Sequence, residues 1–478
     1  MSIIRILLVV LSMLSILMLA PFFMALILGE SQMMFAFLLP ILIGGIPGIL
    51  IKYIFRKKTL TIRPKDGFLL VFLTWAFGTL LGSLCYYLSP ANMNLPTAIF
   101  ESACGFSTTG ATTINDLDIM PRSLLFWRSI SHWAGGMGII LLFVALLTLL
   151  GISNFQLIKA EVPGPEKERL RPRITDTAKV IWGVYCIFTA VLIILYNLGG
   201  MSLYDSVCHA FTIISTGGVS VKNDGFASYN SAFIDWVTII FMLLGAINFS
   251  LYYRLIRGRI TDFIHNTEVR IFLLIFLISA IIISINIIPN YLSVTQAFRY
   301  GFFQAVSILT TTGNIRADFT LWPSFAQSIL FGLMLVGGCS GSTAGGIKVI
   351  RHVVLFKQSA NEIRRLLYPR GVFSIQLNRK VGRKDVVYGV AGFIFVYFTI
   401  IGIGTLLTAA SGLDLASSIY TAVAFTGNIG SSITTSGVLN SYNDFPNYLK
   451  LFYSLVMIMG RLELWTVLVL FTPQYWKA

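Results

Sequence analysis

The sequence predicts an all-α integral membrane protein in which one unit, a span followed by a pore half-helix and a second span, occurs four times. Only 12% of its 478 residues are charged and 56% are hydrophobic, whereas soluble domains carry about 25% charged residues. A short phrase of hydroxylated residues and glycine recurs along the chain, and recurrence at a near-constant spacing indicates one structural unit used repeatedly. The glycines of the four phrases are Gly110, Gly217, Gly313 and Gly430.

Two N-terminal transmembrane helices are expected at 3–29 and 35–55, within a first section over 1–58. The first apolar run is too long for a signal-peptide core and suits a retained span of about 20 apolar residues. Basic residues follow the second run, including Arg56 and Lys57. Because basic residues collect on the cytoplasmic side of a membrane, we expect both this stretch and the N-terminus in the cytoplasm.

The first repeat is expected over 59–160. Between its two spans, Asn94 or Asn92, together with Pro96, marks a helix start. The stretch from there to the phrase at 108–110 is too short to cross a membrane, so it suits a re-entrant half-helix beside a water-filled path. Glu101 lies within this half-helix and is a candidate for supporting the phrase from behind or for facing the outer vestibule.

Three further repeats are expected over 161–260, 261–370 and 371–478. In the first of these, the second span is expected over 231–253. The basic connections fall on the side opposite the phrases, so the half-helices enter from outside. Their carbonyl ends carry partial negative charge, and four such ends around one pore would favour a cation. The half-helices are expected to begin at residues that can cap a first turn: Ser202, Ser293 and Asp414.

The phrases themselves predict a ring of oxygen atoms. Glycine permits backbone conformations that turn carbonyl groups toward an axis, and rings of carbonyl oxygens replace the hydration shell of potassium in selectivity filters. Four copies would close such a ring within one chain; four ordinary turns between helices are the alternative. The candidate filter residues are Thr108, Thr109, Gly110, Ser215, Thr216, Gly217, Thr311, Thr312, Gly313, Asn428, Ile429 and Gly430.

The second span of the third repeat, expected over 324–366, is interrupted by a glycine- and serine-rich run at 336–347. Such a run forms helix poorly. We expect a flexible intramembrane loop that blocks or opens the path, with a loop outside the membrane joining two short helices as the alternative. A phosphate-binding loop is excluded because Ile347 stands where that motif needs lysine. The candidate gate residues are Gly337, Gly338, Ser340, Gly341, Ser342, Thr343, Gly345, Gly346 and Arg461.

Arg461 lies near the middle of the last span, expected over 447–471. A charge at that depth costs at least ~2.5–3.5 kcal/mol on insertion scales, so it needs a partner. Three arrangements are open at this point. The guanidinium could contact carbonyl groups of the glycine-rich loop, face a water-filled path, or form an ion pair with Glu463 or another acid.

Several functions are excluded by composition. The net charge of +15 does not indicate nucleic-acid binding, because the basic residues lie between apolar spans. The basic connection over 159–179 is expected to be a solvated cytoplasmic loop, with partner docking as an additional role. Five cysteines without a CxxC pair and four dispersed histidines indicate free thiols and no metal site. No convincing catalytic set of serine, histidine and aspartate is present, so we expect neither an enzyme nor a cofactor, with potassium ion as the substrate.

The whole chain resembles the bacterial Trk/Ktr potassium-uptake family, most closely its TrkH branch. The signals are the four phrases, GGCSGSTAGGIKVIR at 337–351 and GRLELWTVLVLFTP at 460–473. The resemblance implies a homodimer in the bacterial inner membrane, with the glycine-rich loop as gate. It implies a cytosolic nucleotide-binding regulatory ring, TrkA-like, docked on the basic face. It also implies that glycine in all four filter positions goes with potassium selectivity.

We therefore expect selective potassium uptake driven by the membrane potential alone. The closest alternative is a symporter that couples potassium to protons or sodium, which the scarcity of acids and histidines within the spans disfavours. A potassium-binding subunit of an ATP-driven pump is another alternative and would require a tightly bound ATPase. A purely structural membrane protein is the last, and it has no need for four filter phrases.

Overall fold

Regular structure in this protein is almost entirely helical. The computed structural model describes residues 2–54, 64–138, 174–378, 380–381, 384–434, 437–439 and 441–477. Within these ranges six helices are long and apolar enough to cross a membrane, or up to eight if each of two bent pairs counts as one span. This agrees with the predicted all-α membrane fold. The first part of the expected cytoplasmic connection, 159–173, lies outside the described residues.

The N-terminal section packs through small residues. A Cβ on Gly44 would overlap the hydroxyl of Ser15, and a Cβ on Gly48 would overlap Ser12. Small residues let membrane helices approach closely, which replaces the hydrophobic driving force available in water. The helices of this section are α1 (Ser2–Leu17), α2 (Leu19–Leu28) and α3 (Ser31–Ile54).

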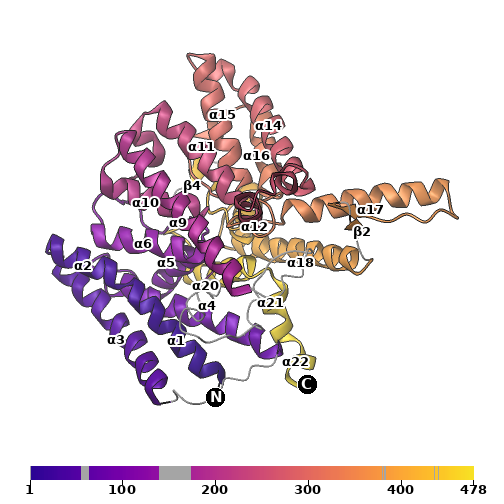
Figure 1. Ribbon diagram of the computed structural model, residues 1–478. Coiled ribbons are helices and arrows are strands. Elements are labelled where there is room, and N and C mark those ends of the chain that lie inside the picture. The colour runs from indigo at the N-terminus through magenta and orange to yellow at the C-terminus, as the bar shows by residue number, and fades with distance from the viewer. Residues whose placement is uncertain are drawn as a thin grey trace.

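In the rest of the chain, a long helix, a shorter and largely buried helix, and a third element follow one another four times (Figure 1). The first two sets are α4 (Pro64–Tyr87), α5 (Leu95–Ser107) and α6 (Arg122–Gly136), then α9 (Ile174–Leu198), α10 (Leu203–Ile214), α11 (Ala232–Ala246) and α12 (Phe249–Ile256). The other two are α14 (Thr267–Asn286), α15 (Val294–Leu309), α16 (Ser324–Met334) and α17 (Val349–Leu367), then α18 (Lys384–Ala409), α19 (Leu415–Thr426), α20 (Asn447–Arg461) and α21 (Trp465–Leu468).

Shorter elements lie within and between these sets. They are α13 (Ile260–Ile264), α22 (Pro473–Lys477), the 3-10 turns η1 (Gly225–Tyr229), η2 (Ile288–Asn290), η3 (Phe319–Leu321) and η4 (Val469–Phe471), and the antiparallel hairpins of β1 (Gln376–Leu377) with β2 (Lys380–Val381) and β3 (Ser432–Thr434) with β4 (Gly437–Leu439).

The predicted starts of the short helices are confirmed. Side-chain oxygens accept hydrogen bonds from first-turn amides, which satisfies donors that the helix itself leaves unpaired. The third short helix has 16 residues where the others have 12 or 13, which accounts for the longer interval before its phrase. The bonds are Thr97 N to Asn94 (3.0 Å), Asp205 N to Ser202 (3.1 Å), Gln296 N to Ser293 (3.2 Å) and Ser417 N to Asp414 (3.1 Å).

Two spans that the sequence predicts as continuous, 231–253 and 447–471, are sharply bent. The axes of α11 and α12 meet at 93°, and those of α20 and the α21–η4 segment at 109°. At the first bend, the side chain of Asn248 accepts from Ser250 N at 2.8 Å and starts a new helix. At the second, Glu463 and Leu464 both adopt positive φ. Apolar periodicity alone does not reveal either bend because it continues across both.

The interruption expected in the third repeat is present. Helix α16 ends at Met334 and α17 begins at Val349, with no helix between them. Helix α17 then extends away from the main body of the molecule beside the β1–β2 hairpin (Figure 1). The last turn of α17 carries Arg364 and Arg365.

Candidate functional site

All four phrases share one backbone conformation. Each short helix is followed by a left-handed residue that is not glycine, then by one further residue, and then by a left-handed glycine. Positive φ is uncommon outside glycine and marks backbone held by its surroundings. The left-handed pairs are Thr108 and Gly110, Thr216 and Gly218, Thr311 and Gly313, and Asn428 and Gly430.

In the second phrase this conformation lies one residue later than the sequence predicts. Gly218 holds the place that we assigned to Gly217, and Gly217 is equivalent to Thr109. Ser215 caps the end of α10. Two adjacent glycines fit the spacing equally well, so the sequence could not choose between them. The register follows from matched bonds: Thr109 N to Cys104 O, Gly217 N to Thr212 O, Thr312 N to Ser307 O, and Ile429 N to Ala424 O.

The phrases meet in a closed ring. In each case a Cβ built on the glycine of one phrase would overlap a carbonyl oxygen of the next phrase, so the backbones are in direct contact. The fourth contact returns to the first phrase, and the ring closes within one chain. The contacts are Gly110 to Gly217 O, Gly218 to Thr312 O, Gly313 to Ile429 O, and Gly430 to Thr109 O.

Glu101 supports the first phrase from behind. Its side chain is fully buried and accepts hydrogen bonds from the hydroxyls of Thr112 (2.9 Å) and Thr113 (2.8 Å), just beyond the phrase. Arg128 of α6 lies 3.5 Å from its other carboxylate oxygen. Of the two positions left open for Glu101, the structure selects the one behind the phrase. Sequence reasoning missed Arg128, although a charge in a buried helix is a usable signal.

The third phrase has its own buried ion pairs. Asp235 of α11 is 3.0 Å from Arg316, which follows the phrase by three residues, and 3.3 Å from Arg299 of α15. The Asp235 and Arg316 side chains are 1% and 5% exposed. Buried charges of this kind persist only when paired. Sequence reasoning also missed these residues. Asp235 and Arg299 are isolated charges in otherwise apolar helices, whereas Arg316 lies two residues from Asp318 in a polar stretch.

The glycine-rich loop lies directly against the inner ends of the short helices. Gly345 N donates to the hydroxyl of Thr311 at 2.6 Å, within the third phrase. Thr343 donates to the carbonyl oxygens of Gly245 (2.9 Å) and Ile214 (3.1 Å). The loop is mostly buried and is not a connection outside the helix bundle. It thus lies in contact with the ring.

Glu268 of α14 anchors the start of the same loop. Its carboxylate is buried and accepts from Ser340 N at 2.7 Å and from Ile350 N, in the first turn of α17, at 3.3 Å. A carboxylate at a helix N-terminus is favoured by the unpaired amides there. This one side chain therefore links the loop to the first turn of α17, the helix that extends away from the main body of the molecule.

Arg461 contacts carbonyl groups on two different elements. Its guanidinium donates to the carbonyl oxygen of Gly135, at 2.9 Å, and to that of Gly136, both at the end of α6. It also donates to the carbonyl oxygen of Thr343 in the glycine-rich loop. Of the arrangements left open for Arg461, contact with loop carbonyls is the one observed. Glu463 pairs instead with Arg351 at 2.5 Å.

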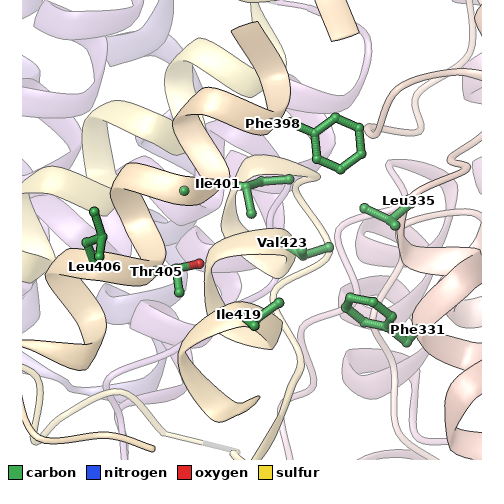
Figure 2. Close-up of a pocket in the computed structure, with 9 residues that line it drawn as sticks. Phe331, Leu335, Phe398, Ile401, Thr405, Leu406, Ile419 and Val423 are labelled. Carbon is green, nitrogen blue, oxygen red and sulfur yellow. The ribbon is translucent and has the colours of Figure 1, made fainter. Parts of the chain in front are cut away.

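A separate cavity lies between α16, α18 and α19 (Figure 2). Its volume is about 550 Å³, and Phe331, Phe398 and Ile419 are among its lining residues. The hydroxyl of Thr405 is the one polar side-chain group in the lining. An apolar space of this kind offers little to a hydrated cation, so the ring remains the candidate site.

Helices long and apolar enough to cross a membrane, around short buried helices whose ends gather polar backbone in one ring, define a polytopic membrane transport protein. Comparison with known proteins gives the family. The family model described as "TrkH: Cation transport protein" matches residues 29–478, and the chain belongs to the TrkH family. This confirms the resemblance found in the sequence, and with it the expectation of a transporter and not an enzyme.

Similar proteins cover almost the whole chain. "Trk system potassium uptake protein TrkH" of Halomonas elongata is 36% identical over 482 residues, which is 99% of each chain. "Trk system potassium uptake protein TrkG" of Escherichia coli K12 is 35% identical over 475 residues, covering 97% of this chain and 96% of the relative. The crystal structure of the potassium transporter TrkH from Vibrio parahaemolyticus matches with a TM-score of 0.89 and 32% identity over 99% of both chains.

Proposed function

We propose that this chain is the pore-forming subunit of a potassium uptake system in a bacterial inner membrane. Relatives of nearly equal length are described as potassium uptake proteins. The observation that carries the proposal is the closed ring of phrases, because it gathers backbone carbonyl groups from four short helices in one place. The coupled-symport alternative finds no support among these relatives.

In this proposal potassium exchanges its water shell for oxygen atoms of the ring. The inner ends of α5, α10, α15 and α19 add partial negative charge, which favours a cation. Ile429 contributes only its backbone carbonyl, and Ser215 supports the second phrase from beneath. The filter positions are Thr108, Thr109, Gly110, Thr216, Gly217, Gly218, Thr311, Thr312, Gly313, Asn428, Ile429 and Gly430.

The glycine-rich loop over 336–347 is the proposed gate. It contacts Thr311 of the ring, and Arg461 fixes it through the carbonyl oxygen of Thr343. Opening would require these contacts to break together. Because α17 follows the loop directly and extends outward, a displacement of α17 would pull on the loop.

No chemical catalyst or cofactor is needed for this transport. A membrane potential is worth about 2.3 kcal/mol per charge per 100 mV, so roughly −150 mV sustains an inward potassium gradient of a few hundredfold. The pore has only to be selective and to open.

The proposed assembly is a homodimer in the lipid membrane with a TrkA-like cytosolic ring that binds nucleotide and docks on the basic face. The N-terminus is proposed to be cytoplasmic. The chain is divided in this proposal into two N-terminal helices over 1–58 and repeats over 59–160, 161–260, 261–370 and 371–478. The boundary at 58 and the one at 160 lie outside the described residues.

The test is a flux assay on purified protein in liposomes. A potassium gradient should drive uptake of rubidium tracer, and the reversal potential should follow the potassium gradient alone. Added sodium at equal concentration should compete poorly. A reversal potential that shifts with the proton or sodium gradient, or an absence of rubidium flux in protein that remains folded, would contradict the proposal.

A further inference from the structure

His132 packs against the backbone of the second phrase. It lies on α6 and is 0% exposed. A Cβ built on Gly217 would overlap its Nδ1 atom. Gly135 and Gly136, one turn later on the same face of α6, approach the ends of α5 and α10 just as closely. The turn of α6 from His132 to Gly136 is therefore fitted against the base of the ring.

The second phrase differs from the other three at this position. Thr109, Thr312 and Ile429 each carry a side chain there, and all three are buried. Gly217 has none, and it is not among the described glycines with positive φ. Its backbone therefore does not demand glycine. The reason for glycine at 217 is the imidazole ring, which fills the space that a side chain would take.

Gly217 is held from two sides. Its carbonyl oxygen is the atom that meets Gly110 in the ring, while His132 lies against its Cα. Neither ring nitrogen of His132 has a hydrogen-bond partner among the described residues. Buried polar atoms are usually paired, and these two nitrogens are an exception. The packing of the imidazole ring, and not hydrogen bonding, therefore sets its position. A shift of the imidazole would allow the Gly217 carbonyl to shift with it.

We propose that His132 is a specificity-determining positioning residue, whose imidazole replaces the missing side chain of Gly217 and fixes the Gly217 carbonyl oxygen in the ring. The inference rests on the proposed potassium filter. It assigns a selectivity role to a side chain that lies outside the four phrases and outside the half-helices that precede them.

The test is a pair of reciprocal substitutions, with the potassium-to-sodium permeability ratio as readout. His132→Ala leaves a void behind Gly217, and Gly217→Thr overlaps the imidazole. Each single variant should lower the ratio by about tenfold or more, equivalent to about 1.4 kcal/mol. The double variant places a threonine, as in two other phrases, in the emptied space, and it should recover to within about threefold of wild type.

Matched controls carry the same substitutions elsewhere. His265→Ala changes an exposed histidine, and Gly183→Thr adds a side chain where a Cβ would meet no atom within 4 Å. Both should keep the wild-type ratio. If His132→Ala or Gly217→Thr does not yield monodisperse protein, His132→Asn and Gly217→Ala provide smaller changes of the same kind, with the same expected direction.

Two results would overturn the inference. One is an unchanged ratio in folded His132→Ala; the other is a double variant no more selective than the worse single variant, which would show that the two residues do not complement each other. Failure of wild-type protein to conduct rubidium selectively would instead remove the proposed function itself, and the two failures are thereby distinguished.

Discussion

Gly313 shows why the left-handed glycine of each phrase cannot be replaced by a residue with a side chain. Its φ is +74°, where other residues are strained, and a Cβ there would overlap the carbonyl oxygen of Ile429. Both restrictions apply at Gly110, Gly218 and Gly430 as well. At Gly217 only the steric restriction applies, and the overlapping group is the side chain of His132 instead of a carbonyl oxygen. Within the second phrase, glycine is therefore needed at positions 217 and 218 for different physical reasons.

Gly313→Ser should weaken the discrimination of potassium from sodium. The added side chain has to displace the Ile429 carbonyl, and carbonyl placement determines how well the ring replaces water. We expect a fall of about tenfold or more in the permeability ratio, measured by tracer competition in liposomes. Gly200→Ser is the matched control, because Gly200 also has positive φ but its Cβ would meet no atom within 4 Å. Equal ratios in both variants would argue against the filter assignment.

Glu101→Gln should destabilise the folded protein. It removes the charge that neutralises buried Arg128, and breaking one partner of a buried pair costs about 3–5 kcal/mol. The thermal unfolding midpoint in detergent should fall clearly. Replacing both residues, as Glu101→Gln with Arg128→Met, should recover part of the loss. Glu362→Gln, at an exposed pair, should change stability by no more than about 0.5 kcal/mol; an equally small effect at Glu101 would contradict the support role.

Residue-level chemistry was only partly predictable from the sequence. The capping roles of Asn94 and Ser202 were predictable because they depend on a first turn only a few residues away. The register of the second phrase was not, because Gly217 and Gly218 are the same residue type, and only the folded backbone shows that Gly218 has positive φ and Gly217 does not. His132 carried no local signal at all, since its partner lies 85 positions further along the chain.

At the scale of elements, the proposed gate is held by contacts between α20, α6 and the glycine-rich loop. A single guanidinium joins them, and only an arginine presents several donors in a rigid fork. Lysine keeps the charge but offers a compact ammonium group that cannot serve carbonyls on two elements in the same way. The charge and the geometry of Arg461 can therefore be tested separately.

Arg461→Lys should raise basal rubidium flux in liposomes that lack the cytosolic partner, because the loop loses its contact at Thr343. Shortening the segment 338–346 should raise flux further. Arg259→Gln, an exposed change, should have no effect. Unchanged or reduced flux in both folded variants would contradict the gate assignment.

The elements were predicted unevenly, and for a physical reason. The interruption over 336–347 was predictable because glycine and serine disfavour helix along its whole length. The bends after α11 and α20 were missed because each depends on one or two residues, Asn248 at the first and Glu463 with Leu464 at the second. An apolar run predicts that a segment is long and apolar enough to lie in a membrane, but it does not predict where the helix axis bends.

At the scale of the whole molecule, the spacing of the phrases predicted four units but not their neighbours. The contacts run from the first phrase to the second, third and fourth, and back to the first. Consecutive units thus lie side by side, as connected elements usually do. Arg461 adds a link from the fourth repeat to the first and the third. Contacts between distant positions of this kind leave no trace in local composition.

The proposed dimer is tested by mass. Two copies of a 53.0 kDa chain should appear as a species of twice that mass by native mass spectrometry or light scattering in mild detergent. The proposed pore is contained in each copy, so flux per chain should be unchanged when the dimer is diluted apart. A strictly monomeric protein that still conducts would contradict the dimer and leave the pore assignment in place.

Closure of the ring within a single polypeptide has an evolutionary consequence. In a homotetrameric channel, one substitution appears at the same position in all four subunits around the ion, so a single subunit cannot be changed alone. Here a codon change alters one quadrant and leaves three intact, and the four quadrants already differ at the position held by Thr109, Gly217, Thr312 and Ile429. In the proposed filter, selection can therefore alter ion preference one phrase at a time, and each phrase can acquire its own supporting residues.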